Sequence, residues 1–235
     1  MLANYPLAAI GVIHSPYQEK FAIPRQPRLA PNVISSIALQ GDINTPESVR
    51  GLTEFSHIWL LFLFDQNIAA GWKPTVRPPR LGGNQRIGVL ASRATFRPNH
   101  IGMSAVELVG VRHEKGQVWI DVRGADLMNG TPIIDIKPYI PYSDAITNAN
   151  GGYADEVPQT LPVIFSQQAQ LELAKHQDGQ QVRSVIEDVL AQDPRPSYKK
   201  GKTDDKIYAV HLFDLNVCFQ LTDEMIQVTA IDKVK

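Results

Sequence analysis

The sequence predicts a mainly β protein, in which a small closed β-barrel is followed by a smaller α+β domain. Short segments rich in Val and Ile recur through the first ~140 residues, and no helical pattern interrupts them. A helical pattern appears only later, in the last third of the chain. Short strands without intervening helices favour a barrel or sandwich over a doubly wound parallel sheet.

Six segments are bounded by Gly, Pro or polar clusters and are predicted to be the strands of the first domain. Val118, Ile120 and Val122 alternate with Trp119 and Asp121, which is the period of two expected when one face of a sheet is buried. The predicted strands are Ala9–His14, Phe55–Phe64, Ile87–Ala91, Val106–Val111, Val118–Val122 and Ile133–Ile136.

Two connections are longer than ordinary turns and indicate a functional loop and a linker. The segment 67–86 contains three prolines and the pair Gly82-Gly83, and loops of this length are usually functional or disordered. The segment 143–160 is polar and rich in Gly and Asn, so we place a linker there. The expected division is a barrel domain at 1–142 and a C-terminal α+β domain at 161–235.

The second domain is predicted from one helix and three strands. Val182, Val185, Ile186, Val189 and Leu190 fall at i, i+3, i+4, i+7 and i+8, an apolar stripe that predicts a helix stopped by Pro194. Three further segments then resemble antiparallel strands, namely Ile207–Phe213, Asn216–Leu221 and Met225–Ile231.

The charge is unevenly distributed along the chain. The 235 residues include 23 Lys+Arg and 24 Asp+Glu, a formal charge of −1. Residues 66–106, here called the basic segment, contain six of these cations and no acid, so the rest of the chain sums to −7. An anionic ligand such as nucleic acid would explain the segment. The alternative is that its arginines pair with acids from elsewhere in the fold.

Several classes of protein are excluded or disfavoured. The longest apolar run, Ile58–Phe64, is seven residues against the roughly 20 needed for a membrane helix. Residues 1–20 lack the features of a secretion signal, and the single Cys218 forms no intrachain disulfide, which favours a cytoplasmic protein. The six histidines show no metal-ligand spacing, and no Gly-rich nucleotide loop or G-x-S-x-G motif is present, so we expect no metal.

Three clusters of Pro, Arg, Asn, Asp and Gly are the strongest local signals. They are Pro24-Arg25-Gln26, the segment 93–102 and the segment 126–139. In the third cluster, the alternation of Asp135, Lys137 and Tyr139 would place an acid, a cation and a phenol on one face of a strand. The alternative is a surface ion pair beside a core tyrosine, and the pattern alone names no reaction.

These clusters also carry a resemblance to a known family. Together with Ile10–Tyr17, Arg50–Leu52, Phe55–His57, Arg77–Gly83 and Leu190–Tyr198, they resemble the single-β-barrel S-adenosylmethionine-dependent tRNA methyltransferases. That family methylates N6 of threonylcarbamoyl-adenosine at tRNA position 37, beside the anticodon. The resemblance covers essentially the whole chain. This sequence departs from the pattern at His14, His100 and Asn129, where arginine, proline and aspartate are usual.

The resemblance implies a barrel that binds the methyl donor S-adenosyl-L-methionine without a Rossmann turn, commonly at a homodimer interface. Catalytic roles are implied for Asp135, Lys137 and Tyr139, with Asp135 and Tyr139 as alternative bases or as groups that orient the urea. The implied donor-binding residues are Pro24, Arg25, Gln26, Ser56, His57, Arg86, Phe96, Asp126, Leu127, Met128 and Asn129.

The implied partner is the tRNA anticodon stem-loop. Arg97, Asn99 and Lys137 are expected to hold the threonyl carboxylate and carbonyls through charge-assisted bonds. The expected substrate-binding residues are Arg77, Arg80, Arg93, Arg97, Asn99, Arg195 and Lys199, with Lys73, Lys200 and Lys202 as further cations near phosphates.

Two other functions remain open at the level of sequence. One is a non-catalytic RNA-binding barrel that uses the basic segment alone, and donor binding would separate it from an enzyme. The other is an S-adenosylmethionine-dependent methyltransferase with a different acceptor. For Lys199, Lys200 and Lys202 the alternative is a solvated hairpin loop.

Overall fold

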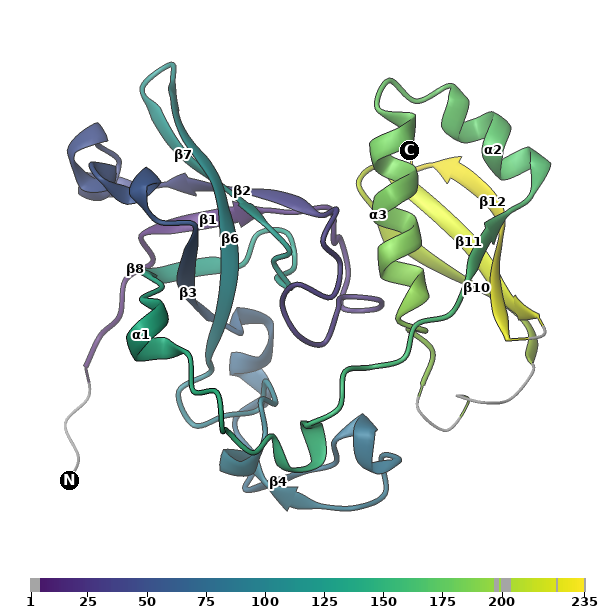
Figure 1. The fold of residues 1–235 in the computed structure, drawn as a ribbon, viewed down its shortest axis with the longest axis horizontal. Helices are drawn as coiled ribbons and strands as arrows, with labels where there is room; N and C mark the ends of the chain where they lie inside the picture. Colours follow the sequence, from purple (N-terminus) through teal and green to yellow (C-terminus); the bar gives the residue numbers. More distant parts are fainter. Residues whose placement is uncertain (1–4, 197–198, 200–203, 223, 235) are drawn as a thin grey trace.

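The computed structural model describes residues 5–196, 199, 204–222 and 224–234. Its first part is a closed barrel of six antiparallel strands in the order β1-β2-β7-β6-β3-β8 (Figure 1). The strands are β1 (Gly11–His14), β2 (Ile34–Leu39), β3 (His57–Leu63), β6 (Ile101–Glu114), β7 (Gln117–Arg123) and β8 (Pro132–Pro138). The predicted fold class is confirmed.

Five of the six predicted first-domain strands lie in the barrel, whereas the prediction for Ile87–Ala91 is confirmed only for its first two residues. Of Ile87–Ala91, only β5 (Ile87–Gly88) is a strand, and it pairs with β4 (Thr75–Val76) outside the barrel. Val89–Ala91 is a 3-10 helix, η6. The sixth barrel strand is β2, which the sequence reading missed because Ser35 and Ser36 dilute its apolar pattern.

The barrel interior is filled by apolar side chains. Along β3 and β7, buried and half-buried residues alternate strictly, as the period of two requires. The core includes Ile13, Ile37, Leu60, Val106 and Ile120. These side chains occupy the interior of this small barrel, so the candidate site residues are sought in the loops and on the outer face.

A β-bulge in β8 orients that outer face. Leu61 of β3 is opposite Asp135, but the next residue, Phe62, is opposite Ile133, so Ile134 is the extra residue. Ile133 is buried, whereas Asp135 and Lys137 are partly exposed. The bulge therefore changes the alternation, and Asp135 and Lys137 emerge together on the outside of the barrel.

Short helical turns fill the connections around the barrel. Three follow β2, and the others lie in the long connections after β3 and β8. Their bounds are η1 (Gly41–Ile43), η2 (Pro46–Val49), η3 (Leu52–Glu54), η4 (Asp65–Ala70), η5 (Pro79–Leu81), α1 (Pro141–Asp144) and η7 (Gly152–Ala154). In Figure 1 the connection that carries β4 lies at one end of the barrel, below β3 and β6.

The second part is a four-stranded sheet in the order β10-β11-β12-β9, with two helices. Its elements are β9 (Val163–Phe165), α2 (Gln167–Ala174), α3 (Gly179–Ala191), β10 (Asp204–Leu212), β11 (Leu215–Thr222) and β12 (Met225–Lys233). The predicted helix is α3, and its whole apolar stripe is buried. The sequence reading missed β9, which pairs in parallel with β12, and α2.

The two parts share a hydrophobic core. Tyr17, Ala30 and Val33 come from the connection between β1 and β2, yet they pack with the buried residues of α3 and β10–β12. Backbone hydrogen bonds join the same connection to β10 and its turn, from Gln18 N–H to His211 O and from Phe213 N–H to Pro16 O. The segment 15–33 is therefore built into both parts of the fold.

We expect Gly102→Ala to destabilise the barrel, because a Cβ at this position of β6 would overlap the ring of Phe62, which is itself buried. The expected loss is about 1–3 kcal/mol in the free energy of unfolding, measured in urea. Gly110→Ala in the same strand is the control, since a Cβ there meets nothing within 4 Å. Equal stabilities of the two variants would contradict this description of the barrel packing.

Candidate functional site

Three loops converge beside the barrel and form what we call the polar loop site. It consists of Pro24–Gln26, Arg93 and Asp126–Asn129. Arg93 Nη1 donates a hydrogen bond of 2.6 Å to Gln26 Oε1, and the charge of Arg93 acts on the carboxylate of Asp126. Gly124, at φ +74°, lets the chain pass close to Arg28, whose N–H donates to the Gly124 carbonyl at 2.7 Å.

Asp126 is the electrostatic centre of the polar loop site. Ser104 of β6 is buried, and its hydroxyl donates to Asp126 Oδ1 at 2.6 Å. Burial raises the pKa of Asp126 to about 6, although the Ser104 bond and the charge of Arg93 act in the opposite direction. A carboxylate held in this way favours a cationic ligand, because the ligand's charge would offset the cost of burial.

The loop that carries Asp126 is fixed to the end of β1. Ser15 Oγ donates to the carbonyl of Leu127 at 2.8 Å, and Ser15 N–H donates to Asn129 Oδ1 at 3.2 Å. Asn129 N–H in turn donates to the carbonyl of Tyr17 at 2.8 Å. The amide oxygen of Asn129 thus acts as a structural acceptor that holds the loop to the end of β1.

The predicted catalytic residues lie on the outer face of β8. Lys137 Nζ is 2.9 Å from Asp135 Oδ2, and the two side chains are 62% and 46% exposed. Tyr139 follows the end of the strand, and its ring packs against Trp59 and His57 at centroid distances of 5.7 and 6.3 Å. The acid and the cation meet as the alternation predicts, and the phenol lies beside an aromatic cluster at the strand end.

Ser56 and His57 form a second polar pair, at the start of β3. Ser56 Oγ is 2.9 Å from His57 Nδ1. His57 is opposite Glu107 on β6, whereas Asp126 is bonded to Ser104 of the same strand. Glu107 and Ser104 are three positions apart, which is ~10 Å along a strand. Among the described residues, Ser56 and His57 have no hydrogen bond to the polar loop site, so one chain does not bring all predicted donor residues together.

The basic segment keeps its charges available. Within the described part of the chain, none of its six cations forms an ion pair with a carboxylate within 4.0 Å, which argues against internal pairing as its explanation. Arg80 donates to the Glu156 carbonyl and Arg97 to the Ser92 carbonyl. Lys73 Nζ lies 4.8 Å from the centroid of the Phe96 ring. Arg77, Arg86 and Asn99 are exposed.

One predicted substrate residue is not on the surface. Arg195 is fully buried, with Nε 2.8 Å from Asp193 Oδ1 and Nη2 3.0 Å from Asp193 Oδ2. The expectation that it contacts phosphate is wrong for this structure, because its guanidinium has no exposed surface. Lys199 lies among the described residues, whereas Lys200 and Lys202 lie outside them.

The structure adds residues that the sequence reading missed. Ser104 had no signal, because it occupies an inward position of a strand. Asp144 accepts hydrogen bonds from Trp59 Nε1 at 3.0 Å and from Ile140 N–H at 2.8 Å, and these bonds lower the pKa of Asp144. Trp72 is 54% exposed beside Lys73 in the basic segment. In the sequence, Trp72 stands between Gly71 and Lys73, and this polar surrounding was the signal that could have predicted its exposure.

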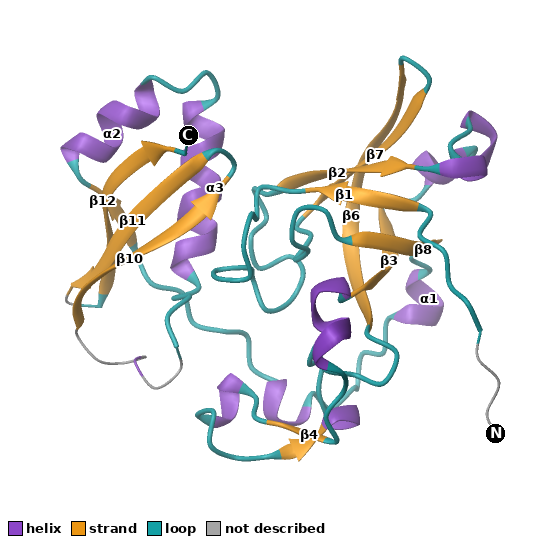
Figure 2. Ribbon diagram, turned by 180° about the vertical axis from the view of Figure 1, so that it is seen from behind, coloured by secondary structure: helices purple, strands orange, loops and turns teal. Residues whose placement is uncertain are grey.

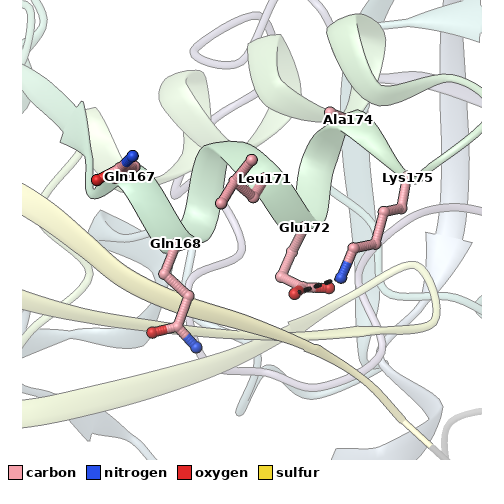
Figure 3. A pocket seen from close by; sticks show the side chains of 6 residues that line it. All are labelled: Gln167, Gln168, Leu171, Glu172, Ala174 and Lys175. Carbon is pink, nitrogen blue, oxygen red and sulfur yellow. Dashed lines mark hydrogen bonds and ion pairs between the residues drawn. The ribbon is translucent and has the colours of Figure 1, made fainter.

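Other candidate sites are weak. A shallow hollow runs along α2, lined by exposed side chains of that one helix and its end, among them Leu171, Glu172 and Lys175 (Figure 3). It contains none of the predicted site residues. In the described ranges, no group of three His, Cys, Asp or Glu could hold a metal ion, and no helix has the length and hydropathy of a bilayer span.

The closed barrel, with a polar loop site beside it and a basic segment, defines a class of β-barrel protein that differs from a Rossmann fold. Residues 12–145 match the family model of the tRNA-methyltransferase O N-terminal domain, and residues 158–234 match that of the TrmO C-terminal domain. The chain belongs to the TrmO family.

Relatives match along nearly the whole chain. The tRNA (adenine(37)-N6)-methyltransferase of Escherichia coli K12 is 46% identical over 233 residues, 98% of this chain and 99% of that protein. The "Putative S-adenosylmethionine-dependent methyltransferase RcsF" of Pseudomonas aeruginosa is 46% identical over 218 residues, 91% of each. The crystal structure of TrmO from Pseudomonas aeruginosa superposes with a TM-score of 0.80 at 39% identity, covering 99% of this chain and 100% of that one.

We expect the pKa of Asp126 to be visible in the pH dependence of stability. Its rise from 3.8 to about 6 means that the folded state binds this proton more tightly than the unfolded state does. Stability is therefore lost as pH rises from 4 to 7, by about 1–3 kcal/mol. Asp126→Asn keeps the acceptor for Ser104 but cannot titrate, so its unfolding free energy should lack this loss.

Urea unfolding of both proteins at several pH values between 4 and 7 measures the difference. Asp42→Asn, which removes an exposed carboxylate in η1, is the control and should follow the parent protein. Parallel curves for Asp126→Asn and the parent would show that Asp126 is not desolvated in the folded protein.

Proposed function

We propose that this protein is an S-adenosylmethionine-dependent methyltransferase that methylates N6 of threonylcarbamoyl-adenosine at tRNA position 37. The observation that carries the proposal is the match over 98% of the chain to the Escherichia coli tRNA (adenine(37)-N6)-methyltransferase. The polar loop site and the unpaired basic segment support it independently. A cytoplasmic location follows from the substrate.

The residues of the polar loop site fit the methyl donor. S-adenosylmethionine carries a cationic sulfonium and amino group, a carboxylate and an adenine, and when bound it supplies an electrophilic methyl group. The desolvated carboxylate of Asp126 would hold a cationic group, while Arg93 and Arg25 would hold the carboxylate. Half-buried Met128 offers an apolar contact to a base, whereas Pro24 and Leu127 are buried and can contribute only backbone groups.

Asp135 and Lys137 would act on the acceptor. The threonylcarbamoyl group makes the N6 proton more acidic than in adenosine, so a carboxylate such as Asp135 can accept this proton as N6 gains the methyl group. Lys137, 2.9 Å from Asp135, would compensate its charge before the reaction and hold a urea or threonyl oxygen. Tyr139 is the alternative base, and positioning alone would contribute to the rate.

The basic segment would meet the anticodon stem-loop. Arg77, Arg80 and Lys73 are exposed and can contact phosphates, which position the RNA without reading its sequence. Trp72, exposed among these cations, can stack on an unpaired base of the loop. Arg97 and Asn99 are closest in sequence to the turn at His100 and would contact the modified nucleotide.

A homodimer would complete this site. In one chain the outer face of β8 has no hydrogen bond or ion pair to the polar loop site among the described residues. His57 lies opposite Glu107, which is three positions or ~10 Å along β6 from Ser104, the partner of Asp126. The outer face of the barrel beside β8 also carries Met103 of β6, which is 51% exposed, next to half-buried Leu61 and Trp59 of β3. Pairing through this apolar face would bring one copy's catalytic residues toward its partner's donor site, and sedimentation at assay concentration would report the mass.

The decisive test of the function uses labelled S-adenosylmethionine and total tRNA from cells with and without the threonylcarbamoyl modification. We expect label only in the modified tRNA, because N6 of unmodified adenosine is less acidic and lacks the group that the site would hold. Equal labelling of both pools would exclude the modified adenosine as substrate. No labelling, together with RNA binding, would favour the non-catalytic RNA-binding protein.

The roles of Asp135 and Lys137 are tested by Asp135→Ala and Lys137→Ala. We expect each variant to lose at least ~100-fold in turnover, in the usual range for removal of a general base or its charge partner. Donor binding, measured by calorimetry, should stay within a few fold, because both residues lie outside the polar loop site. Turnover near the parent value in both variants would contradict the assignment.

A further inference from the structure

One face of α3 is hydrogen-bonded to the backbone of the loop that follows Pro24–Gln26. Asp188 Oδ2 accepts the N–H of Asn32 at 2.7 Å, and Gln181 Nε2 donates to the carbonyl of Asn32 at 2.7 Å. Gln192, directly after the helix, donates from Nε2 to the carbonyl of Leu29 at 3.2 Å. Figures 1 and 2 show this loop extending from the barrel toward α3.

The helix presents these groups from a fixed position. Gln181, Asp188 and Gln192 are spaced at i, i+7 and i+11, which places them on one side of a helix. The adjacent side is the stripe from Val182 to Leu190, which is buried in the core that also contains Ala30 and Val33. Because α3 cannot shift without disrupting this core, its polar row holds the loop backbone in one place.

Asp188 makes the strongest of these contacts. Burial raises the pKa of Asp188, while the hydrogen bond from Asn32 lowers it. A partly desolvated carboxylate bonded to a backbone N–H is a charge-assisted hydrogen bond, and removal of the acceptor leaves the N–H without its partner. The loop is therefore sensitive to this one side chain.

An electrostatic interaction also links the end of α3 to the loop at residues 24–32, here called the donor loop. Asp193, held by Arg195, acts on Arg25 and partly compensates the burial that lowers the pKa of Arg25. On the other side, Tyr17 accepts a backbone hydrogen bond from Asn129 and forms a β-bridge to Leu212 of β10. Two of the three loops of the polar loop site, at 24–26 and 126–129, are thus attached to the second domain.

We propose that Asp188 and Gln181 of α3 are positioning residues for the donor loop, so that the second domain sets the affinity for S-adenosylmethionine through the loop at residues 24–32. This inference rests on the function proposed above. It assigns to α3 a role in the methyl-donor site, whereas the expected role of this domain was RNA contact.

The test combines donor binding with amide exchange. In Asp188→Ala, we expect hydrogen exchange in a peptide covering residues 27–34 to accelerate ~5–10-fold and the Kd for S-adenosylmethionine, measured by calorimetry, to rise ~5–10-fold. Asp188→Asn retains an acceptor oxygen and should change both values less than Asp188→Ala does. Gln181→Ala, an exposed and therefore mild change, should move both values in the same direction.

Glu187→Ala and Gln180→Ala are matched controls, because they alter neighbouring side chains of α3 that have no hydrogen bond to the loop among the described residues. Both should bind the donor as the parent does. Faster exchange in Asp188→Ala and Gln181→Ala with an unchanged donor Kd would overturn the proposal. A parent protein that binds no donor would reject the proposed function as well, while the exchange data would still report whether α3 holds the loop.

Discussion

The fold depends on one shared segment, residues 15–33, which leaves the barrel after β1 and returns to it as β2. Tyr17, Ala30 and Val33 are buried in the core of the second domain, although they belong to the connection between two barrel strands. Hydrophobic burial provides most of the free energy that holds such a contact. Because the same segment carries Pro24–Gln26, the geometry of the polar loop site depends on how the two parts of the protein pack.

The filled barrel explains why the candidate functional residues are external. A barrel of six strands has room only for its own side chains, and here its core is mainly aliphatic and aromatic. The candidate site residues then lie at loops, at strand ends and where a bulge changes the alternation, apart from Ser104, which reaches Asp126 from an inward strand position. All three occur: the loops at 24–26 and 126–129, the strand end at Tyr139, and the bulge in β8 that places Asp135 and Lys137 side by side outside.

The sequence predicted best what local patterns determine. The apolar stripe of α3 and the alternation of β7 follow from periods of 3.6 and 2, and both are confirmed. The strand β2 was missed because Ser35 and Ser36 interrupt its apolar pattern, and the hydrogen bond that Ser36 Oγ donates to Asp121 is a tertiary contact that sequence does not show. Arg195 was misplaced because sequence does not show whether a cation is buried against a neighbouring acid. The Ser104–Asp126 contact joins residues 22 apart, which no periodicity encodes.

The charges separate into two kinds, and this separation connects the fold to the chemistry. Asp126 is desolvated and bonded by a serine, so its negative charge is costly until a cation lies beside it. Five of the six cations of the basic segment are exposed, Arg97 is half-buried, and all six lack ion pairs within the described structure, so most of their positive charge is available to phosphates at little desolvation cost. A sulfonium ligand and a polyanion have opposite requirements, and one chain of charge −1 would meet both because Asp126 is desolvated and most cations of the basic segment are exposed. Net charge therefore says little about the partners of this protein, whereas the burial of each charged group says which partner it can serve.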